Sequence, residues 1–290
     1  MFKGTFSALI TPFKDGVLDE RALRELIEWQ IQQGVDGIVP CGSTGEAATL
    51  SHAEHERVIK IAIGQARRRV QVLAGTGSNS TAEAIRLTAF AREAGADGAL
   101  LISPYYNKPT QEGIFQHYKA IADAVGLPLV VYNIPGRTAS NIMPETLGRL
   151  ARINHVVGVK ESSGSMEQAS EIVRLCGDKM TVLSGDDSLT VPLMALGARG
   201  VVSVITNVVP GQMCELVRHA MAGDFARARE LHYRLLPLMR AMFVETNPIP
   251  VKYAASLLGK CGAEVRLPLT PLSVEGAERV RTAMNEAGLL

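Results

Sequence analysis

The sequence predicts an α/β fold, a (β/α)8 TIM barrel followed by a C-terminal helical extension. Eight short apolar runs alternate with longer amphipathic segments, which is the pattern of parallel strands joined by helices. The apolar runs lack a clean two-residue alternation and are separated by helices, so we expect a parallel sheet covered on its outer face. A doubly wound open sheet is the alternative, but no G-x-G-x-x-G motif opens its first helical segment.

The expected elements follow one another at intervals of roughly 30 residues, which suits an eightfold barrel. The predicted strands are residues 6–11, 37–40, 70–75, 98–103, 129–134, 156–160, 181–184 and 200–203. The predicted helices are residues 20–33, 53–68, 81–94, 111–125, 144–151, 166–176, 189–196 and 210–222. Residues 1–223 are therefore expected to form the barrel. Residues 224–290 are expected to form the extension, with helices at 225–243, 251–258 and 274–287.

Helix boundaries carry recognisable end signals. Ser51 and Glu54 have the spacing of a capping box at the start of the second predicted helix. Glycines that are expected to end helices in the left-handed conformation follow five of the segments, at Gly34, Gly95, Gly126, Gly177 and Gly197.

Composition narrows the class of protein. The chain has 290 residues, and its 30 Lys and Arg residues nearly balance 29 Asp and Glu residues without a basic block, so nucleic acid is not an expected partner. Cys41, Cys176, Cys214 and Cys261 lack metal-ligand spacing and are expected to be reduced thiols. No signal peptide and no membrane-spanning apolar run is visible, so we expect a cytoplasmic enzyme without membrane contact.

Lys160 closes the apolar run of residues 156–159. An apolar strand surrounds an amine with low-dielectric walls, and burial disfavours the ammonium form. A neutral amine attacks carbonyl carbon atoms and forms a Schiff base. The alternative is a strand-end lysine that extends to water, and this segment alone favours that alternative. The other strand ends bear on the choice, because barrel enzymes carry their chemistry there.

Two loops after predicted strands carry hydroxyl groups. Ser43 and Thr44 lie between glycines after the second strand, where hydroxyls and backbone N–H groups can bind a carboxylate. Tyr105 and Tyr106 lie in a Pro-bounded loop after the fourth strand, which suits a site or a subunit interface. The alternatives are an ordinary Gly-Ser loop and aromatic residues that only pack.

The fifth predicted strand brings Tyr132, and Arg137 follows it in a Pro-Gly turn. A planar guanidinium suits a carboxylate, whereas a solvated loop arginine is the alternative. His52 and His55 have no visible third metal ligand, so no metal is expected, and nothing in the sequence calls for a cofactor. Five neighbouring strand ends thus bring together two hydroxyl-bearing loops, a tyrosine, an arginine and a lysine, with no visible set of metal ligands.

The combination resembles the 4-hydroxy-tetrahydrodipicolinate synthase (dihydrodipicolinate synthase) family, within the pyruvate-dependent class I aldolase superfamily. The resemblance extends through nearly the whole chain and includes residues 42–46, 103–113, 132–138, 159–161 and 247–252. Lyases of sialic acid and of keto-deoxy sugar acids share the first and fourth of these motifs. The Tyr-Tyr-Asn and Pro-Gly-Arg-Thr segments point to the synthase.

The resemblance implies a lyase that condenses pyruvate with L-aspartate 4-semialdehyde to 4-hydroxy-tetrahydrodipicolinate, in diaminopimelate and lysine biosynthesis. Lys160 is then expected to form an imine with pyruvate. Tyr132, Ser43 and Tyr106 are expected to form a hydroxyl relay for acid–base catalysis. The resemblance places Tyr106 in the site of the neighbouring subunit and implies a homotetramer, a dimer of dimers.

The resemblance also implies four substrate-binding residues: Thr44 for the pyruvate carboxylate, Arg137 for the carboxylate of the second substrate, and Gly185 and Val202 for backbone contacts. Ser43 stands where the family often has threonine, and serine is less restricted at χ1, so a looser relay is expected. The Gly-Ser-Thr form also occurs in the sugar-acid lyases, which keeps a sugar-acid lyase as the alternative. A non-catalytic barrel that senses a keto acid is a third hypothesis.

Some bacterial members of the family are inhibited by lysine at a dimer interface. The matching positions here are Ala47, Ala48, His52, His55, Asn79, Glu83 and Tyr105. Glu83 can pair with a ligand ammonium, whereas an ordinary polar interface is the alternative. The resemblance therefore implies lysine as an allosteric inhibitor.

Overall fold

The computed structural model describes residues 2–290 and places eight parallel strands in a closed barrel. The strand order is β1-β10-β9-β8-β7-β6-β5-β4, so each strand pairs with the next barrel strand along the chain and β10 closes the barrel on β1. The strands are β1 (Gly4–Ala8), β4 (Gly37–Val39), β5 (Gln71–Gly75), β6 (Gly98–Ile102), β7 (Leu129–Asn133), β8 (Val156–Glu161), β9 (Thr181–Ser184) and β10 (Gly200–Ser203). The predicted barrel is confirmed, and the open sheet is excluded.

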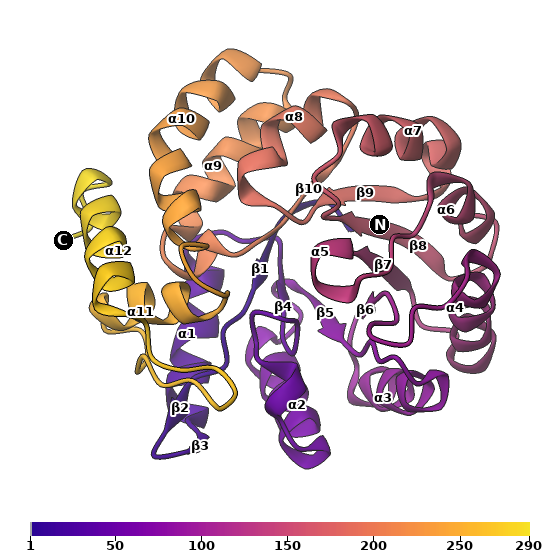
Figure 1. Cartoon of the computed structure of the whole chain (residues 1–290), viewed down its shortest axis with the longest axis horizontal. Helices are drawn as coiled ribbons and strands as arrows, with labels where there is room; N and C mark the ends of the chain where they lie inside the picture. Colours follow the sequence, from indigo (N-terminus) through magenta and orange to yellow (C-terminus); the bar gives the residue numbers. More distant parts are fainter. Residues whose placement is uncertain (1) are drawn as a thin grey trace.

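Helices surround the barrel (Figure 1). The long ones are α1 (Glu20–Gln32), α2 (His52–Ala66), α3 (Thr81–Ala94), α4 (Gln111–Val125), α6 (Pro144–Leu150), α7 (Met166–Cys176), α8 (Thr190–Ala195) and α9 (Pro210–Met221). Short turns are α5 (Pro135–Thr138), η1 (Ala47–Thr49), η2 (Gly177–Lys179), η3 (Asp187–Leu189) and η4 (Ile205–Asn207). The extension contains α10 (Phe225–Ala241), α11 (Ile249–Leu257) and α12 (Val274–Glu286). The predicted helices are therefore present with slightly shifted bounds.

The predicted capping box is confirmed, whereas Gly177 lies outside the left-handed helical region, with ψ of −138°. Ser51 Oγ accepts a hydrogen bond from Glu54 N at 3.2 Å, and Glu54 Oε2 accepts one from Ser51 N at 2.9 Å, which is a complete capping box. The five glycines expected after helices all have positive φ.

Burial explains why the strands lack alternation. In β7 all five residues are buried, because Val130 and Tyr132 pack inside the barrel whereas Leu129 and Val131 pack in the core that includes the surrounding helices. Alternate side chains of a strand point to opposite faces, and here both faces are apolar.

The N-terminal strand differs from its prediction. β1 ends at Ala8, whereas the predicted strand extended over residues 6–11. Leu9 and Ile10 are fully buried outside the strand, although Leu9 N still donates to the carbonyl oxygen of Val39 in β4 at 3.2 Å. A small antiparallel hairpin follows, formed by β2 (Phe13–Lys14) and β3 (Val17–Leu18), which the prediction missed.

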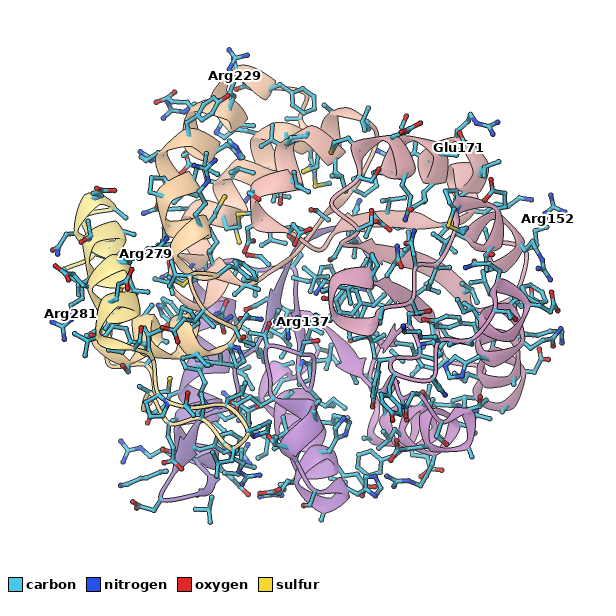
Figure 2. The ribbon with its side chains drawn as sticks, viewed as in Figure 1. Arg137, Arg152, Glu171, Arg229, Arg279 and Arg281 are labelled. Carbon is cyan, nitrogen blue, oxygen red and sulfur yellow. The ribbon has the colours of Figure 1, made fainter. Side chains whose placement is uncertain are left out.

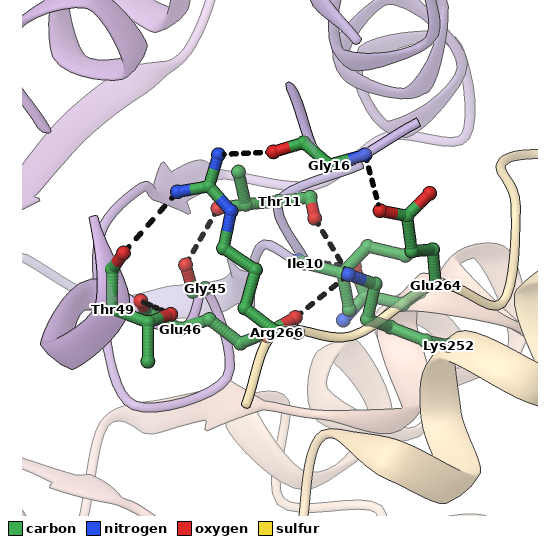
Figure 3. A network of polar contacts seen from close by, with 10 residues as sticks. Ile10, Thr11, Gly16, Gly45, Glu46, Thr49, Lys252, Glu264 and Arg266 are labelled. Carbon is green, nitrogen blue, oxygen red and sulfur yellow. Dashed lines mark hydrogen bonds and ion pairs between the residues drawn. The ribbon is translucent and has the colours of Figure 1, made fainter. Parts of the chain in front are cut away.

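A buried polar network joins the extension to the loop after β4 (Figure 3). Lys252 of α11 is fully buried and donates to Glu46 Oε1 at 2.7 Å and to the carbonyl oxygen of Thr11 at 2.9 Å. Glu46 Oε2 also accepts from the backbone N–H of Arg266 at 3.0 Å. Buried charges are stable only when they are paired and hydrogen bonded, so this network fixes residues 42–46 against the extension.

The extension lies beside the barrel at the end of the chain (Figure 1). α10 packs on α8 and α9, and α12 packs on α10 and α11. The division of the chain at residues 223 and 224 stays a prediction.

Candidate active site

Lys160 lies in β8, level with Tyr132 of β7 and Leu183 of β9. The residue is 5% exposed, so it does not extend into bulk water. Its Nζ lies 4.1 Å from the centroid of the Tyr132 ring. The phenol and the amine are therefore neighbours, and both are buried.

Gly185 leaves the space that the Lys160 side chain occupies. A Cβ atom at Gly185 would lie 2.9 Å from Lys160 Cε and would overlap Ser162 Oγ. The close approach requires glycine at the end of β9, directly beside the amine.

A small cavity of about 40 Å³ contains most of the predicted site. Of the eight predicted catalytic and substrate-binding residues, the six that line it are Ser43, Thr44, Tyr132, Arg137, Lys160 and Gly185. Asp186 and Phe243 also line it, and the sequence analysis assigned no role to either. Burial raises the pKa of Asp186, and the nearby Lys160 opposes this shift.

Two predicted residues lie elsewhere. Tyr106 is 88% exposed and lines neither described cavity. Val202 is fully buried in the barrel interior, and Val204 lines the cavity in its place. Within residues 2–290, no hydrogen bond joins the hydroxyls of Ser43, Tyr132 and Tyr106, so a single chain does not complete the predicted relay.

Asn247 connects the two predicted carboxylate-binding residues, and the sequence analysis gave it no role. Its Nδ2 donates to Thr44 Oγ1 at 3.0 Å, and its carbonyl oxygen accepts from Arg137 Nη2 at 3.0 Å. Figure 2 shows Arg137 near the centre of the view, whereas the other labelled side chains lie at the rim. The sequence signal for Asn247 was its place in residues 247–252, one of the segments that carry the family resemblance.

A larger cavity of about 490 Å³ adjoins the small one, and Ser43, Tyr132, Arg137 and Asn247 line both. It brings together most of the predicted regulatory positions, namely Ala47, Ala48, His52, His55, Glu83 and Tyr105. Asn79 does not line it, but its Nδ2 donates to the carbonyl oxygen of Tyr105 at 3.1 Å.

The larger cavity presents a carboxylate. His52 Nε2 lies 2.8 Å from Glu83 Oε1, and the Ser78 hydroxyl donates to Glu83 Oε2. These hydrogen bonds, from Ser78 first and His52 second, hold the pKa of Glu83 below its usual value. Burial lowers the pKa of His55 to about 4, so this imidazole is neutral at pH 7. The cavity therefore suits a ligand with an ammonium group.

Two properties of the described residues concern metal binding and membrane insertion. Among residues 2–290, no group of three or more His, Cys, Asp or Glu side chains could hold a metal ion. No helix in that same range has the length and apolar character needed to cross a bilayer.

Comparison with known proteins identifies the family. The model of the dihydrodipicolinate synthetase family matches residues 1–287. The chain belongs to the dihydrodipicolinate synthetase family.

Two relatives carry the name 4-hydroxy-tetrahydrodipicolinate synthase. The protein of Geotalea uraniireducens (strain Rf4) is 56% identical over 290 residues, which is 100% of both chains. The protein of Nitratidesulfovibrio vulgaris (strain DP4) is 58% identical, and the match covers 100% of this chain and 99% of that protein.

Solved structures of the dihydrodipicolinate synthetase family have the same fold. The dihydrodipicolinate synthase of Aquifex aeolicus has a TM-score of 0.98 and 51% identity, with 99% of each chain covered. The chloride-inhibited enzyme of Acinetobacter baumannii, complexed with pyruvate, has a TM-score of 0.98 and 47% identity over 100% of both chains. The enzyme of Cyanidioschyzon merolae, with lysine bound, has a TM-score of 0.97 and 41% identity over 100% of this chain and 99% of that one. A structure described as the first monomeric dihydrodipicolinate synthase variant has a TM-score of 0.98 and 42% identity over 100% of this chain and 98% of that one.

Proposed function

We propose that this protein condenses pyruvate with L-aspartate 4-semialdehyde to 4-hydroxy-tetrahydrodipicolinate, in diaminopimelate and lysine biosynthesis. The observation that carries the proposal is the buried Lys160, which shares a small cavity with Thr44 and Arg137. The names of the full-length relatives and the pyruvate complex of the Acinetobacter baumannii relative support it.

Lys160 supplies the nucleophile. Its amine attacks the keto carbon of pyruvate, and uptake of a proton with loss of water gives a protonated imine. The imine withdraws electrons from the methyl group, so a proton leaves that carbon and an enamine forms. The enamine carbon attacks the aldehyde carbon of the second substrate, and the aldehyde oxygen takes up a proton. The amino group of the second substrate then attacks the imine carbon, closes the ring and releases Lys160.

Proton transfer falls to Tyr132, because its ring lies 4.1 Å from Lys160 Nζ. Ser43 lines the same cavity, and Tyr106 of a neighbouring subunit completes the hydroxyl relay. The exposure of Tyr106 on its own chain supports this arrangement.

Substrate binding falls to the loops around the amine. Thr44 and the backbone N–H groups of its loop bind the pyruvate carboxylate. Arg137 binds the carboxylate of aspartate semialdehyde through its planar guanidinium. Gly185 and Val202 lend backbone contacts near the pyruvyl group, and Gly185 leaves room for Lys160.

Lysine is proposed as an inhibitor that binds the larger cavity, and a homotetramer as the assembly. The cluster of His52, His55 and Glu83 in one cavity supports the first proposal, as does the lysine complex of the Cyanidioschyzon merolae relative. A cytoplasmic location stays a prediction.

The decisive experiment traps the imine. The protein is incubated with pyruvate and borohydride, and mass spectrometry maps the reduced adduct. We expect the adduct on Lys160 alone, its loss in Lys160→Ala, and full labelling in Lys119→Ala, which removes an exposed lysine of α4.

Turnover then separates the synthase from the sugar-acid lyase, because both form the same adduct. We expect aspartate semialdehyde to be consumed in the presence of pyruvate, and sialic and keto-deoxy sugar acids to be cleaved far more slowly. Faster cleavage of a sugar acid contradicts the proposal. Pyruvate binding without any adduct supports a keto-acid sensor instead.

A further inference from the structure

Asn247 carries a buried hydrogen-bond acceptor that the chain leaves free. The residue is 5% exposed, and within residues 2–290 its Oδ1 has no hydrogen-bond partner. The Nδ2 of the same amide donates to Thr44 Oγ1 at 3.0 Å, which fixes the rotation of the amide. A buried acceptor without a donor lowers stability, and Asn247 lines both cavities, so a ligand bound there could bring the missing donor.

The position of Arg137 indicates which donor that is. Arg137 Nη2 donates to the carbonyl oxygen of Asn247 at 3.0 Å, so the guanidinium lies beside Asn247. Both residues line both cavities. A ligand that carries a carboxylate and an ammonium on one carbon atom can therefore contact Arg137 and Asn247 Oδ1 together. Aspartate semialdehyde has this pair of groups, whereas pyruvate has no N–H group.

We propose that Asn247 Oδ1 accepts a hydrogen bond from the α-ammonium group of the second substrate and selects an amino aldehyde over one without the amino group. The inference deepens the proposed function and rests on it. Arg137 holds the carboxylate, Asn247 holds the ammonium, and the aldehyde carbon is directed to the enamine on Lys160.

The same amide also orients Thr44. Since Thr44 Oγ1 accepts a hydrogen bond from Asn247, the Thr44 hydroxyl hydrogen is free to donate to another group. The carboxylate of pyruvate is the acceptor that the proposed function supplies. Asn247 thus acts on both substrates. Its Nδ2 orients Thr44 for pyruvate, and its Oδ1 accepts a hydrogen bond from the second substrate.

Asp186 is the competing acceptor in the small cavity. It does not line the larger cavity, and its electrostatic partner is Lys160. We therefore expect Asp186→Asn to alter the binding of amino and desamino ligands to the same extent, whereas substitutions of Asn247 separate them.

The test compares two inert ligands that differ only in the amino group, L-homoserine and 4-hydroxybutyrate. In both, an alcohol replaces the aldehyde, so neither reacts. Their inhibition constants against aspartate semialdehyde are measured at saturating pyruvate. We expect the native protein to bind homoserine about tenfold more tightly, a factor that corresponds to about 1.4 kcal/mol. Asn247→Ala is expected to abolish this preference by weakening homoserine alone.

Two further variants sharpen the test. Asn285→Ala truncates an exposed amide of α12 and is expected to keep the preference. Asn247→Asp keeps an acceptor but cannot donate to Thr44, so we expect it to keep the preference and to weaken pyruvate. Asn247→Asp also provides the test if Asn247→Ala fails to fold. An unchanged preference in Asn247→Ala, or a preference lost in Asn247→Asp, overturns the inference.

Imine trapping on the same preparations separates the two proposals. If pyruvate is trapped on Lys160 and the preference does not depend on Asn247, the inference fails and the proposed function stands. If the native protein traps no pyruvate, the proposed function fails and the inference falls with it.

Discussion

Arg137 shows how the geometry of one residue prepares it for a ligand. It lies in the single turn of α5, where its backbone N–H donates to the carbonyl oxygen of Ile134 at 3.0 Å. A guanidinium has five N–H donors, and the bond to Asn247 uses one of them. The remaining donors can bind a carboxylate through two parallel hydrogen bonds, so the turn and Asn247 together hold the fork in place.

Arg137→Ala is therefore expected to impair the second substrate and to spare the first. Hydrogen bonds to charged groups contribute about 1.5–3 kcal/mol, so kcat/KM for aspartate semialdehyde is expected to fall about 10- to 100-fold. The rate of borohydride trapping with pyruvate is expected to stay unchanged. Arg152→Ala, which removes an exposed arginine at the rim in Figure 2, is the control. Equal losses for both substrates contradict the assigned role.

Single residues were predictable from sequence where the signal is local. Lys160 ends an apolar run that by itself favoured a lysine extending to water. The other strand ends and the family resemblance led to its predicted role, and the structure places it buried in β8. Asn247 was not found because its partner Arg137 lies 110 positions away, and no local pattern reports such a contact. Val202 stays a predicted backbone contact, whereas only the structure shows that Val204 lines the cavity.

The larger cavity lies where the starts of two helices meet a short turn and a loop. Ala47 comes from η1, His52 and His55 from the start of α2, Glu83 from the start of α3, and Tyr105 from the loop after β6. Helix starts favour negative charge, which suits Glu83 in the first turn of α3. The cavity shares its wall with the active site, so a ligand there contacts the elements that hold the substrates.

L-Lysine is expected to bind this cavity and to lower activity. Glu83→Gln is expected to weaken lysine about tenfold or more in calorimetric titration, because a charged hydrogen-bond acceptor is lost. Since the pKa of Glu83 is held below its usual value of 4.5, its carboxylate stays charged as pH falls to 5, and binding is expected to persist there. Glu93→Gln, on the exposed side of α3, is the control. The absence of both heat and inhibition with the native protein would falsify this prediction.

Elements with strong periodicity were predictable, and those built on tight turns were not. The helices around the barrel were found because each buries one apolar face. The β2–β3 hairpin was missed, although Asp15 and Gly16 carry its signal. Both have positive φ, 53° and 79°, which a two-residue hairpin turn needs. The hairpin strands are only two residues long, too short for alternation to appear.

At the scale of the whole molecule, one chain holds six of the eight predicted residues in the small cavity and leaves Tyr106 outside it. Tyr106 has a positive φ of 72°, an uncommon conformation for a bulky residue. Such backbone strain concentrates at functional sites, where contacts from elsewhere hold it. The sequence predicted the assembly only through the family resemblance. Subunit contacts depend on the shape of a folded surface, which no local sequence pattern reports.

Complementation between two defective variants tests whether subunits share a site. Lys160→Ala and Tyr106→Ala are each expected to lose most activity. The two chains are then co-expressed with different tags, and the mixed assembly is purified through both. In a mixed dimer, the site with the intact Lys160 receives the intact Tyr106 of the other chain. One site of each mixed dimer is therefore expected to recover, whereas the other lacks both residues.

A control variant and two possible results complete the complementation test. Tyr233→Ala removes a tyrosine of α10 that is 64% exposed, and it is expected to keep full activity as a homo-oligomer. Mixed assemblies that stay inactive contradict exchange of Tyr106 between subunits, because a Tyr106 that serves its own chain cannot rescue another. Full activity of Tyr106→Ala alone removes this tyrosine from the relay. Recovery therefore requires both that Tyr106 acts in catalysis and that it acts across the interface.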